Sequence, residues 1–424
     1  MQNCSPAPDA LPRRPKRAVA LSKRTPSELS AHALLASLEF QAGRFQEAAD
    51  ALAKCVELSP WEAGFAFRLG LAAQKAGNTQ LALASYLRAF RLAPKDPRLA
   101  LFAGAALEDA GRFEEAATVF SLGDDVAANL RTLHADAKQD PEIRERSAKA
   151  DNRIRQHYTQ LHHDSVDEAA RRLAAEGHEP NLDRVRNAIW PQTHLGSFDY
   201  RTPLQAPDIF YMPDLPASPS IPRDRLSWAG AVEACTDAIR REYEDAIRAG
   251  AAMSPYVHAQ TASPTWRELR GKMDWSSLHL YSRAEETPVA KLFPNTLRAL
   301  QAADVVRVGD GRPIEMFFSR LAPGTHIPPH FGAANNRLTV HLPLIVPPNC
   351  AIRVADEIHE WRVGELLAFD DSFEHEAWNR SDSERVVLIF EAHHPDLRPE
   401  ERRAIEHIFM ARERWRQART IPTA

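Results

Sequence analysis

Two histidines in the last third of the chain could bind a metal ion or move a proton. His330 lies in the sequence Pro-Pro-His-Phe-Gly, and His375 lies in Phe-Glu-His-Glu-Ala-Trp-Asn. His326 precedes His330 by four residues, the spacing of paired ligands on a helix of zinc proteases, but Pro328 and Pro329 prevent that helix. A single histidine is more often a core or surface residue than a ligand, so neither position is decisive alone.

A polar stripe in a neighbouring apolar segment requires an explanation. Strand alternation over residues 337–344 places Arg337, Thr339 and His341 on one face and leucine and valine on the other. The polar face either meets bulk water or lines a cavity. An arginine together with a histidine favours an anionic ligand in that cavity.

The elements that would position these residues are short strands bounded by Pro, Gly and Asn/Asp clusters. Strands are predicted at residues 315–321, 337–346, 351–354, 365–369 and 385–391. Because no crossover helices separate them, they predict an antiparallel β-sandwich or barrel. An amphipathic helix, predicted over residues 225–249, packs on this sheet.

The N-terminal part of the chain has an internal repeat of 34 residues. Gly43, Gly77 and Gly111 recur at this step, and small and large residues keep fixed positions around them. The pattern predicts three helix–turn–helix units and is similar to the tetratricopeptide repeat. Such a stack offers a concave surface for a peptide or protein partner, although a scaffolding or dimerisation role is also consistent with it.

Composition excludes several classes of protein. The chain has 424 residues, a net charge of -4, 44% apolar and 26% charged residues, which is typical of soluble globular proteins and gives no basic excess for nucleic acid. Four dispersed cysteines predict neither a disulfide framework nor a thiolate zinc site. The dispersed cysteines favour a reducing cytoplasm as the expected location, and no apolar run approaches the roughly 18 residues of a membrane span.

A longer set of ordered motifs resembles the aspartyl/asparaginyl β-hydroxylase family. The motifs are Phe318 to His326, His330-x-Gly332, Asn336-Arg337-Leu338-x-x-His341-Leu342, Trp361-x-x-Gly364-Glu365, Phe369 to Asn379, Arg385, and His394-Pro395-Asp396-Leu397. This resemblance implies a double-stranded β-helix (jelly-roll or cupin-like) that binds Fe(II) and uses 2-oxoglutarate and O₂.

The resemblance also assigns the metal site. It makes His330 and His375 the iron ligands and leaves Gly332 where most such enzymes carry a carboxylate. Asp371 then becomes a candidate acceptor for a water molecule in the vacant position, with a strand-end residue as the alternative.

The same resemblance places the cosubstrate. Arg385 would hold the distal carboxylate of 2-oxoglutarate, because a guanidinium matches that geometry. Ser319, His341 and Trp275 would line the same pocket. Animal members have a second basic residue two before His341, where this chain has Thr339, so Arg337 is expected to help Arg385 from the same strand face.

The predicted organisation is a disordered basic and Pro-rich tail (1–28), three tetratricopeptide-like repeats (29–130), a helical cap and linker (131–200), the hydroxylase-like β domain (201–400), and a C-terminal helix and tail (401–424). The predicted function is hydroxylation of an Asp- or Asn-type residue in a peptide or protein that the repeats recruit. The alternatives are a related hydroxylase of a free or carrier-bound small amino acid and a non-catalytic repeat scaffold.

Overall fold

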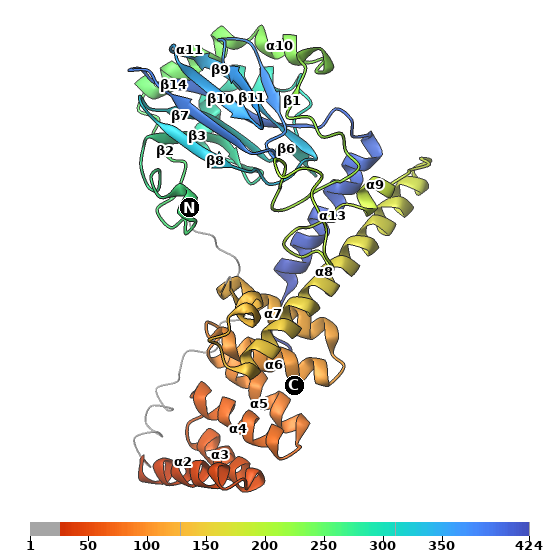
Figure 1. Ribbon diagram of the computed structural model, residues 1–424, viewed down its shortest axis with the longest axis vertical. Helices are drawn as coiled ribbons and strands as arrows, with labels where there is room; N and C mark the ends of the chain where they lie inside the picture. The colour runs from red at the N-terminus through yellow and green to blue at the C-terminus, as the bar shows by residue number, and fades with distance from the viewer. Residues whose placement is uncertain (1–25, 128, 310, 424) are drawn as a thin grey trace. The chain divides into compact units, whose positions relative to one another are not determined.

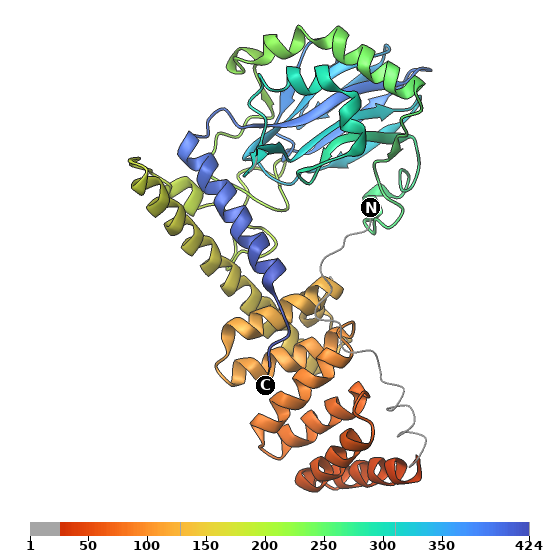
Figure 2. The same ribbon diagram turned by 180° about the vertical axis from the view of Figure 1, so that it is seen from behind.

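A computed structural model describes residues 26–127, 129–309 and 311–423, which form two compact units. The first comprises the described residues up to Leu161 together with those from Met410 onward, and the second comprises His162–Phe409. Figures 1 and 2 show helices in the first unit and a β-sheet core in the second. The predicted class, helical repeats followed by a mostly antiparallel β domain, is confirmed.

Three antiparallel helix pairs build the first unit. They are α2 (Pro26–Gln41) with α3 (Phe45–Leu58), α4 (Ala63–Lys75) with α5 (Thr79–Leu92), and α6 (Pro97–Asp109) with α7 (Phe113–Val126). Each pair turns at a glycine with positive φ, namely Gly43, Gly77 and Gly111, where a side chain would be strained. Of the predicted tail (1–28), residues 1–25 lie outside the described residues, and its expected end at residue 28 falls within α2.

Small residues let the paired helices approach closely. A Cβ atom added to Gly70 would lie 2.5 Å from the Tyr86 ring, and one added to Gly104 would lie 2.4 Å from the Phe120 ring. Both rings are buried in the core of the unit. The 34-residue step therefore repeats one packing arrangement, in which an aromatic ring covers a bare backbone segment.

Residues from the end of the chain complete the first unit. The 3₁₀ helix η1 (Leu130–Ala135) and the start of α8 (Pro141–Ala175) follow the repeats, and α13 (Pro399–Ala418) contributes Trp415 to their core. Arg91 and Arg112 then donate hydrogen bonds to the carbonyl oxygens of Pro422 and Thr423. The C-terminal segment is thus held against the repeats by contacts to its backbone.

The second unit contains two antiparallel sheets. The larger has the order β1 (Ser220–Ile221), β12 (Leu367–Phe369), β9 (Arg337–Ile345), β14 (Arg385–His393), β7 (Glu315–Leu321), β3 (Trp275–Ser282), β2 (Ser254–Pro255), with β4 (Glu285–Glu286) beside β3. The smaller has the order β11 (Glu357–Glu360), β10 (Cys350–Val354), β13 (His375–Asn379), β8 (His326–His330). A separate hairpin joins β5 (Arg307–Val308) and β6 (Arg312–Pro313). An apolar cluster shared by both sheets shows that they pack face to face.

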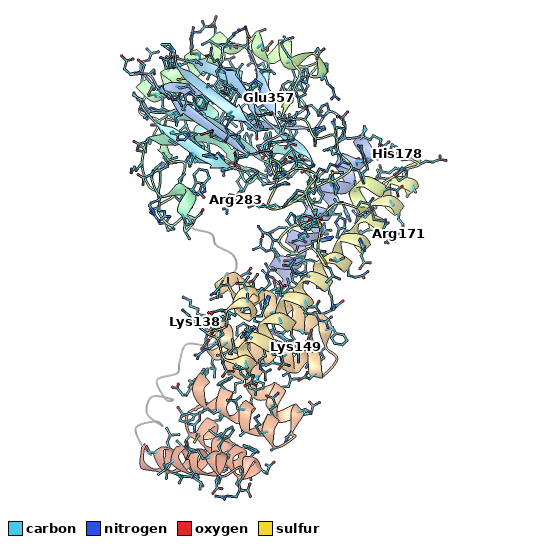
Figure 3. All side chains as sticks on the ribbon, in the orientation of Figure 1. Lys138, Lys149, Arg171, His178, Arg283 and Glu357 are labelled. Carbon is cyan, nitrogen blue, oxygen red and sulfur yellow. The ribbon has the colours of Figure 1, made fainter. Side chains whose placement is uncertain are left out.

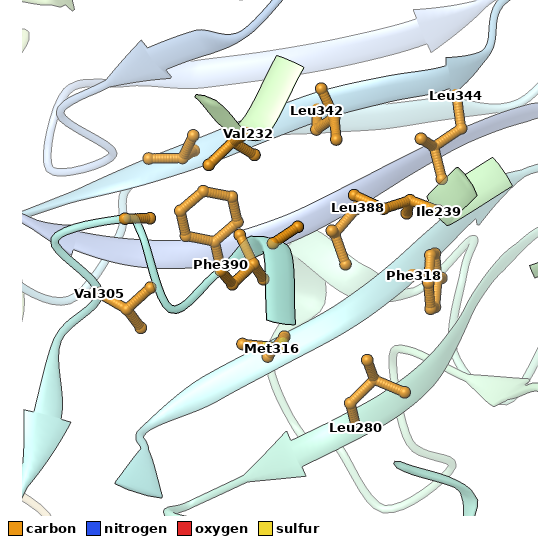
Figure 4. Packing of buried hydrophobic residues seen from close by; sticks show 14 of the residues in the cluster. Val232, Ile239, Leu280, Val305, Met316, Phe318, Leu342, Leu344, Leu388 and Phe390 are labelled. Carbon is orange, nitrogen blue, oxygen red and sulfur yellow. The ribbon is translucent and has the colours of Figure 1, made fainter. Parts of the chain in front are cut away.

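Helices cover the other face of the larger sheet. These are α10 (Ala229–Glu233), α11 (Thr236–Arg248) and α12 (Pro294–Ala299), and the short elements α9 (Asp183–Arg186), η2 (Arg223–Arg225), η3 (Pro264–Trp266) and η4 (Pro288–Leu292) complete the unit. Figure 4 shows Val232 and Ile239 from the helices in the cluster that contains Phe318, Leu388 and Phe390 from the strands. Charged side chains such as Lys138, Arg283 and Glu357 are exposed at the surface (Figure 3).

Two sequence predictions need correction. The single helix expected over residues 225–249 is broken between α10 and α11, where the Thr236 hydroxyl donates to the Glu233 carbonyl oxygen at 2.6 Å and competes with the backbone for that acceptor. Strands β8 and β13, which carry His330 and His375, were not among the predicted strands. Among the described helices, none combines the length and the apolar character that a membrane crossing requires.

The glycine–aromatic contact can be tested with two alanine substitutions. Gly104→Ala would push a methyl group into the buried Phe120 ring, so we expect a loss of about 1–3 kcal/mol in unfolding free energy. Gly64→Ala is the matched control, because its new methyl would be 3.7 Å from the nearest heavy atom beyond its own neighbours and helix backbone, the Glu62 Oε1, and alanine favours helix by about 1 kcal/mol. Urea unfolding of the full chain followed by circular dichroism compares them. Equal stability of the two variants would contradict this packing.

Candidate active site

A cavity of about 430 Å³ between the two sheets collects the polar residues singled out from the sequence. Its walls come from strands of both sheets, together with the segments that precede β3 and β13. All eight predicted site residues line it: Trp275, Ser319, His330, Arg337, His341, Asp371, His375 and Arg385. The predicted alternation of β9 is also confirmed, because Leu338, Val340, Leu342 and Leu344 lie in the apolar core on the other face.

Strand pairing brings the two histidines together. In the antiparallel pair of β8 and β13, His375 is the register partner of His330, and their ring centroids are 4.1 Å apart. Each Nδ1 lies within hydrogen-bond distance of a backbone carbonyl, Pro328 O at 2.8 Å for His330 and Phe373 O at 2.9 Å for His375. A carbonyl can only accept, so both Nδ1 atoms carry the proton and both Nε2 atoms have a free lone pair.

Burial keeps both imidazoles neutral. Removal from water lowers the pKa of His330 to about 3, with help from the neighbouring His375, and lowers the pKa of His375 to about 4. Neutral imidazoles oriented by backbone carbonyls have the form in which histidine binds metal ions. Over the described ranges, no group of three or more His, Cys, Asp or Glu side chains gathers as a metal site, so the protein offers two nitrogen ligands here.

Asp371 fills the space beside Gly332. A Cβ atom on Gly332 would lie 2.2 Å from the Asp371 Cγ, so no larger residue fits there unless Asp371 moves. One carboxylate oxygen of Asp371 accepts from the Thr339 hydroxyl at 2.9 Å, while Oδ1 is buried with no hydrogen-bond partner in the described protein. Burial raises the pKa of Asp371, and Arg337 opposes that rise. The unpaired oxygen is available to a group that enters the cavity.

Arg385 is a buried cation without a protein counter-ion. It is 1% exposed, and no ion pair joins it to a carboxylate in the described part of the chain. Its Nη1 lies 3.4 Å from the Ser319 carbonyl and hydroxyl oxygens, and its guanidinium lies 4.6 Å from the centroid of the Trp361 ring. Burial lowers the pKa of Arg385 to about 10, which leaves it charged at neutral pH. A buried charge of this kind needs an anion.

The residues around Arg385 form a pocket suited to an anion. Trp275 Nε1 donates to the Ser319 hydroxyl at 3.1 Å and orients it. His341 is buried, and its Nδ1 lacks a hydrogen-bond partner within the described ranges. Trp361 was identified only as part of a motif, and its stacking on Arg385 gives it a place at this site.

Arg337 lies away from Arg385. It is the register partner of His393 on β14, eight residues after Arg385, a separation of roughly 26 Å along the strand. Its Nε is 2.9 Å from Glu391 Oε1. The structure thus places all eight predicted residues in one cavity but does not bring Arg337 to the guanidinium that it was expected to assist.

Several residues that line the cavity were not predicted from the sequence. Glu315 and Phe317 alternate with Ser319 on β7, and Glu391 lies on the same face of β14 as Arg385. The period of two that exposed the polar face of β9 could have found them. Tyr256 follows the short strand β2 and Trp266 ends the 3₁₀ helix η3, and no local sequence signal marks either of them.

Both units match known protein families. Residues 233–395 match the sequence model of the aspartyl/asparaginyl beta-hydroxylase family, and residues 13–60 and 67–125 match the tetratricopeptide repeat. Aspartate beta-hydroxylase domain-containing protein 2 from Rattus norvegicus is 30% identical over 256 residues, covering 59% of this chain and 70% of that protein. The chain belongs to the aspartyl/asparaginyl β-hydroxylase family.

Other relatives match shorter segments of this chain. Aspartyl/asparaginyl beta-hydroxylase from Mus musculus is 38% identical over 147 residues, or 34% of this chain. Ornithine lipid ester-linked acyl 2-hydroxylase from Rhizobium tropici is 34% identical over 168 residues, covering 38% of this chain and 56% of that protein. The chain spans 20% of the mouse enzyme and 19% of its human counterpart, so similarity to those enzymes is confined to one domain.

The contact between Gly332 and Asp371 can be tested by a double-mutant cycle. Gly332→Ala places a methyl group on the Asp371 carboxylate, so we expect a loss of about 1–3 kcal/mol in unfolding free energy. Asp371→Ala removes the obstacle, and the double variant should be less destabilised than the sum of the single changes, by about 0.5–3 kcal/mol. Urea unfolding followed by tryptophan fluorescence measures the unfolding free energy of the unaltered chain, the two single variants and the double variant. Strict additivity would show that the two residues do not touch.

Proposed function

We propose that the chain is an Fe(II)- and 2-oxoglutarate-dependent dioxygenase that hydroxylates an Asp- or Asn-type residue of a peptide or protein. One observation carries the proposal: two neutral histidines with free Nε2 atoms share a cavity with a buried, unpaired arginine. Membership in a family of hydroxylases supports it. Fe(II), 2-oxoglutarate and O₂, when bound, would supply the oxidation of a C–H bond, with succinate and CO₂ as coproducts.

The residues present fit these groups. His330 and His375 would hold the iron through Nε2, because their Nδ1 atoms are already committed to backbone carbonyls. The unpaired Oδ1 of Asp371 would accept a hydrogen bond from water in the position that lacks a protein carboxylate. Arg385 would bind the distal carboxylate of 2-oxoglutarate through its guanidinium, and the Ser319 hydroxyl, oriented by Trp275, would donate a second hydrogen bond.

The remaining parts of the cavity would exclude water and position the cosubstrate. Trp361 covers the face of Arg385, and Phe369 packs against both His341 and His375, at centroid distances of 5.1 and 5.5 Å. The tetratricopeptide repeats would recruit the substrate protein, as their pattern suggests.

A small-molecule substrate is the second candidate. The Rhizobium relative, named as an ornithine lipid hydroxylase, is 34% identical over 168 residues. Treating cell peptides and cell lipids separately with the enzyme distinguishes the two. A mass gain of one oxygen in peptides supports the first candidate, and the same gain confined to lipids supports the second.

Substitution of the site residues tests the cofactor assignment. With Fe(II), 2-oxoglutarate and O₂, we expect the full chain to release succinate, and His375→Ala to reduce that release by at least about 100-fold because one of two ligands is lost. Arg385→Gln should raise KM for 2-oxoglutarate by at least about tenfold, equivalent to about 1.4 kcal/mol. His326→Ala is the matched control, since this imidazole, on the same strand, pairs with Glu376 outside the cavity. Undiminished release by His375→Ala would refute the assignment.

A further inference from the structure

The cavity changes in charge along the strands of the larger sheet. Arg385 lies at one end of β14, and Glu391, six residues later on the same face, lies roughly 20 Å along the strand. On the neighbouring β7, Glu315 follows the same trend, four residues before Ser319. Because Phe390 pairs with Met316, Glu391 and Glu315 lie side by side on adjacent strands. We call this region, lined by Glu315, Phe317, Arg337, Glu391 and Tyr256, the acidic end.

We infer that the acidic end binds a cationic group of the substrate, an ammonium or a guanidinium. The inference rests on the proposed function and narrows its substrates to peptides that present Lys or Arg beside the hydroxylated Asp- or Asn-type residue. An aspartate side chain is disfavoured at this end.

The side-chain charges at the acidic end do not balance. Glu391 Oε1 is paired with Arg337 Nε at 2.9 Å, so the charge of Arg337 is already matched. Glu315 then remains as a second carboxylate, with His279 Nδ1 at 3.1 Å and the Arg283 backbone nitrogen at 3.4 Å as its neighbours. Asp371 is left out of this count because it faces the proposed metal site. With both glutamates ionised and the His279 ring uncharged, two carboxylates against one guanidinium leave the acidic end with a negative charge; burial raises the pKa of Glu391, and Arg337 opposes that rise.

One buried carboxylate oxygen at the acidic end is available to a hydrogen-bond donor from a ligand. Glu391 Oε2 is buried, lines the cavity region and has no hydrogen-bond partner in the described structure. A buried carboxylate oxygen without a donor is costly. A positively charged N–H donor would supply the missing hydrogen bond, and bonds of that kind are the stronger class.

Arg337, the cation of the acidic end, is paired with Glu391 and is therefore not available to a substrate carboxylate. Thr339 lies between Arg337 and His341 on the cavity face of β9. Its hydroxyl donates a hydrogen bond to Asp371 Oδ2 at 2.9 Å. A carboxylate that entered here would meet Glu315 and the free oxygen of Glu391, and like charges in contact reject a ligand.

Aromatic rings form one wall of the cavity beside the carboxylates of the acidic end. The ring of Tyr256 stacks on Trp275 at 4.0 Å and lies 5.4 Å from Phe317, and Tyr256 remains 37% exposed. Cations are attracted to the faces of such rings within about 6 Å. The wall and the carboxylates therefore favour the same ligand charge.

Two probes of similar shape and opposite charge test the inference. Butylguanidinium and pentanoate are titrated against the full chain with Fe(II) and saturating 2-oxoglutarate under nitrogen, so that the Arg385 end is filled and no turnover occurs. Saturation-transfer NMR reports each Kd. We expect butylguanidinium to bind at least about tenfold more tightly than pentanoate. Tighter binding of pentanoate would overturn the inference.

Variants assign the binding to the acidic end. Glu315→Gln and Glu391→Gln should each weaken butylguanidinium binding by at least about threefold, while Arg337→Gln should strengthen it because a competing cation is removed. Glu360→Gln, an exposed carboxylate on β11 away from the cavity, is the matched control. Glu391→Gln could fail to fold because Glu391 pairs with Arg337. In that case butylguanidinium binding to Glu315→Gln still tests the inference, because Glu315 is half-buried.

The outcomes separate this inference from the proposed function. Weaker butylguanidinium binding in Arg337→Gln, or unchanged binding in Glu315→Gln, would overturn the cation site whatever the cofactor. A failure of 2-oxoglutarate to bind in an Arg385-dependent manner would refute the proposed function. In that case butylguanidinium titrated without 2-oxoglutarate still tests the acidic end, because the probe does not use Arg385.

Discussion

The register between β8 and β13 is the constraint on which the candidate site depends. It sets His375 opposite His330 and turns both rings into the space between the sheets. A slip of one residue would send either imidazole to the other face of the smaller sheet. The register is held by the apolar residues of the same strands, Ile327 and Ala377, which are paired and buried in the core shared by both sheets. Apolar packing thus sets the geometry of two polar side chains.

The two faces of the larger sheet have different roles, because alternate residues of each strand point to opposite faces. Residues such as Phe318, Leu342 and Leu388 face the helices and form the apolar core, which supplies much of the stabilisation by burial. The alternate residues face the cavity and carry its charges. The polar residues therefore need not stabilise the domain, and a buried cation such as Arg385 can persist because the opposite face of its strand is fully packed.

Charge in the cavity is divided rather than mixed. The Arg385 end has an unmatched cation, the histidine pair is neutral, and the end at Glu315 and Glu391 has an excess of carboxylate. Separated charges in one cavity orient a ligand that has complementary groups, because each wrong orientation brings like charges together. Under the proposed function, this division would bind a dicarboxylate cosubstrate at the Arg385 end and a cationic group of the substrate at the acidic end.

The sequence by itself determined the local features of this protein. Its 34-residue step predicted the helix pairs and their turn glycines, and the alternation of residues 337–344 predicted which side chains share a face. The motifs around His330 and His375 indicated the family. These features were predictable because each depends on residues close together in the chain, where helix and strand periods act directly.

Only the tertiary structure decided how distant residues meet. It paired His330 with His375, filled the space at Gly332 with Asp371, separated Arg337 from Arg385 and matched Arg337 with Glu391. It also broke the helix expected over residues 225–249, where a side-chain hydrogen bond competes with the backbone. These outcomes depend on the register and packing of strands far apart in sequence. Local periodicity leaves that register open, and the buried core selects it.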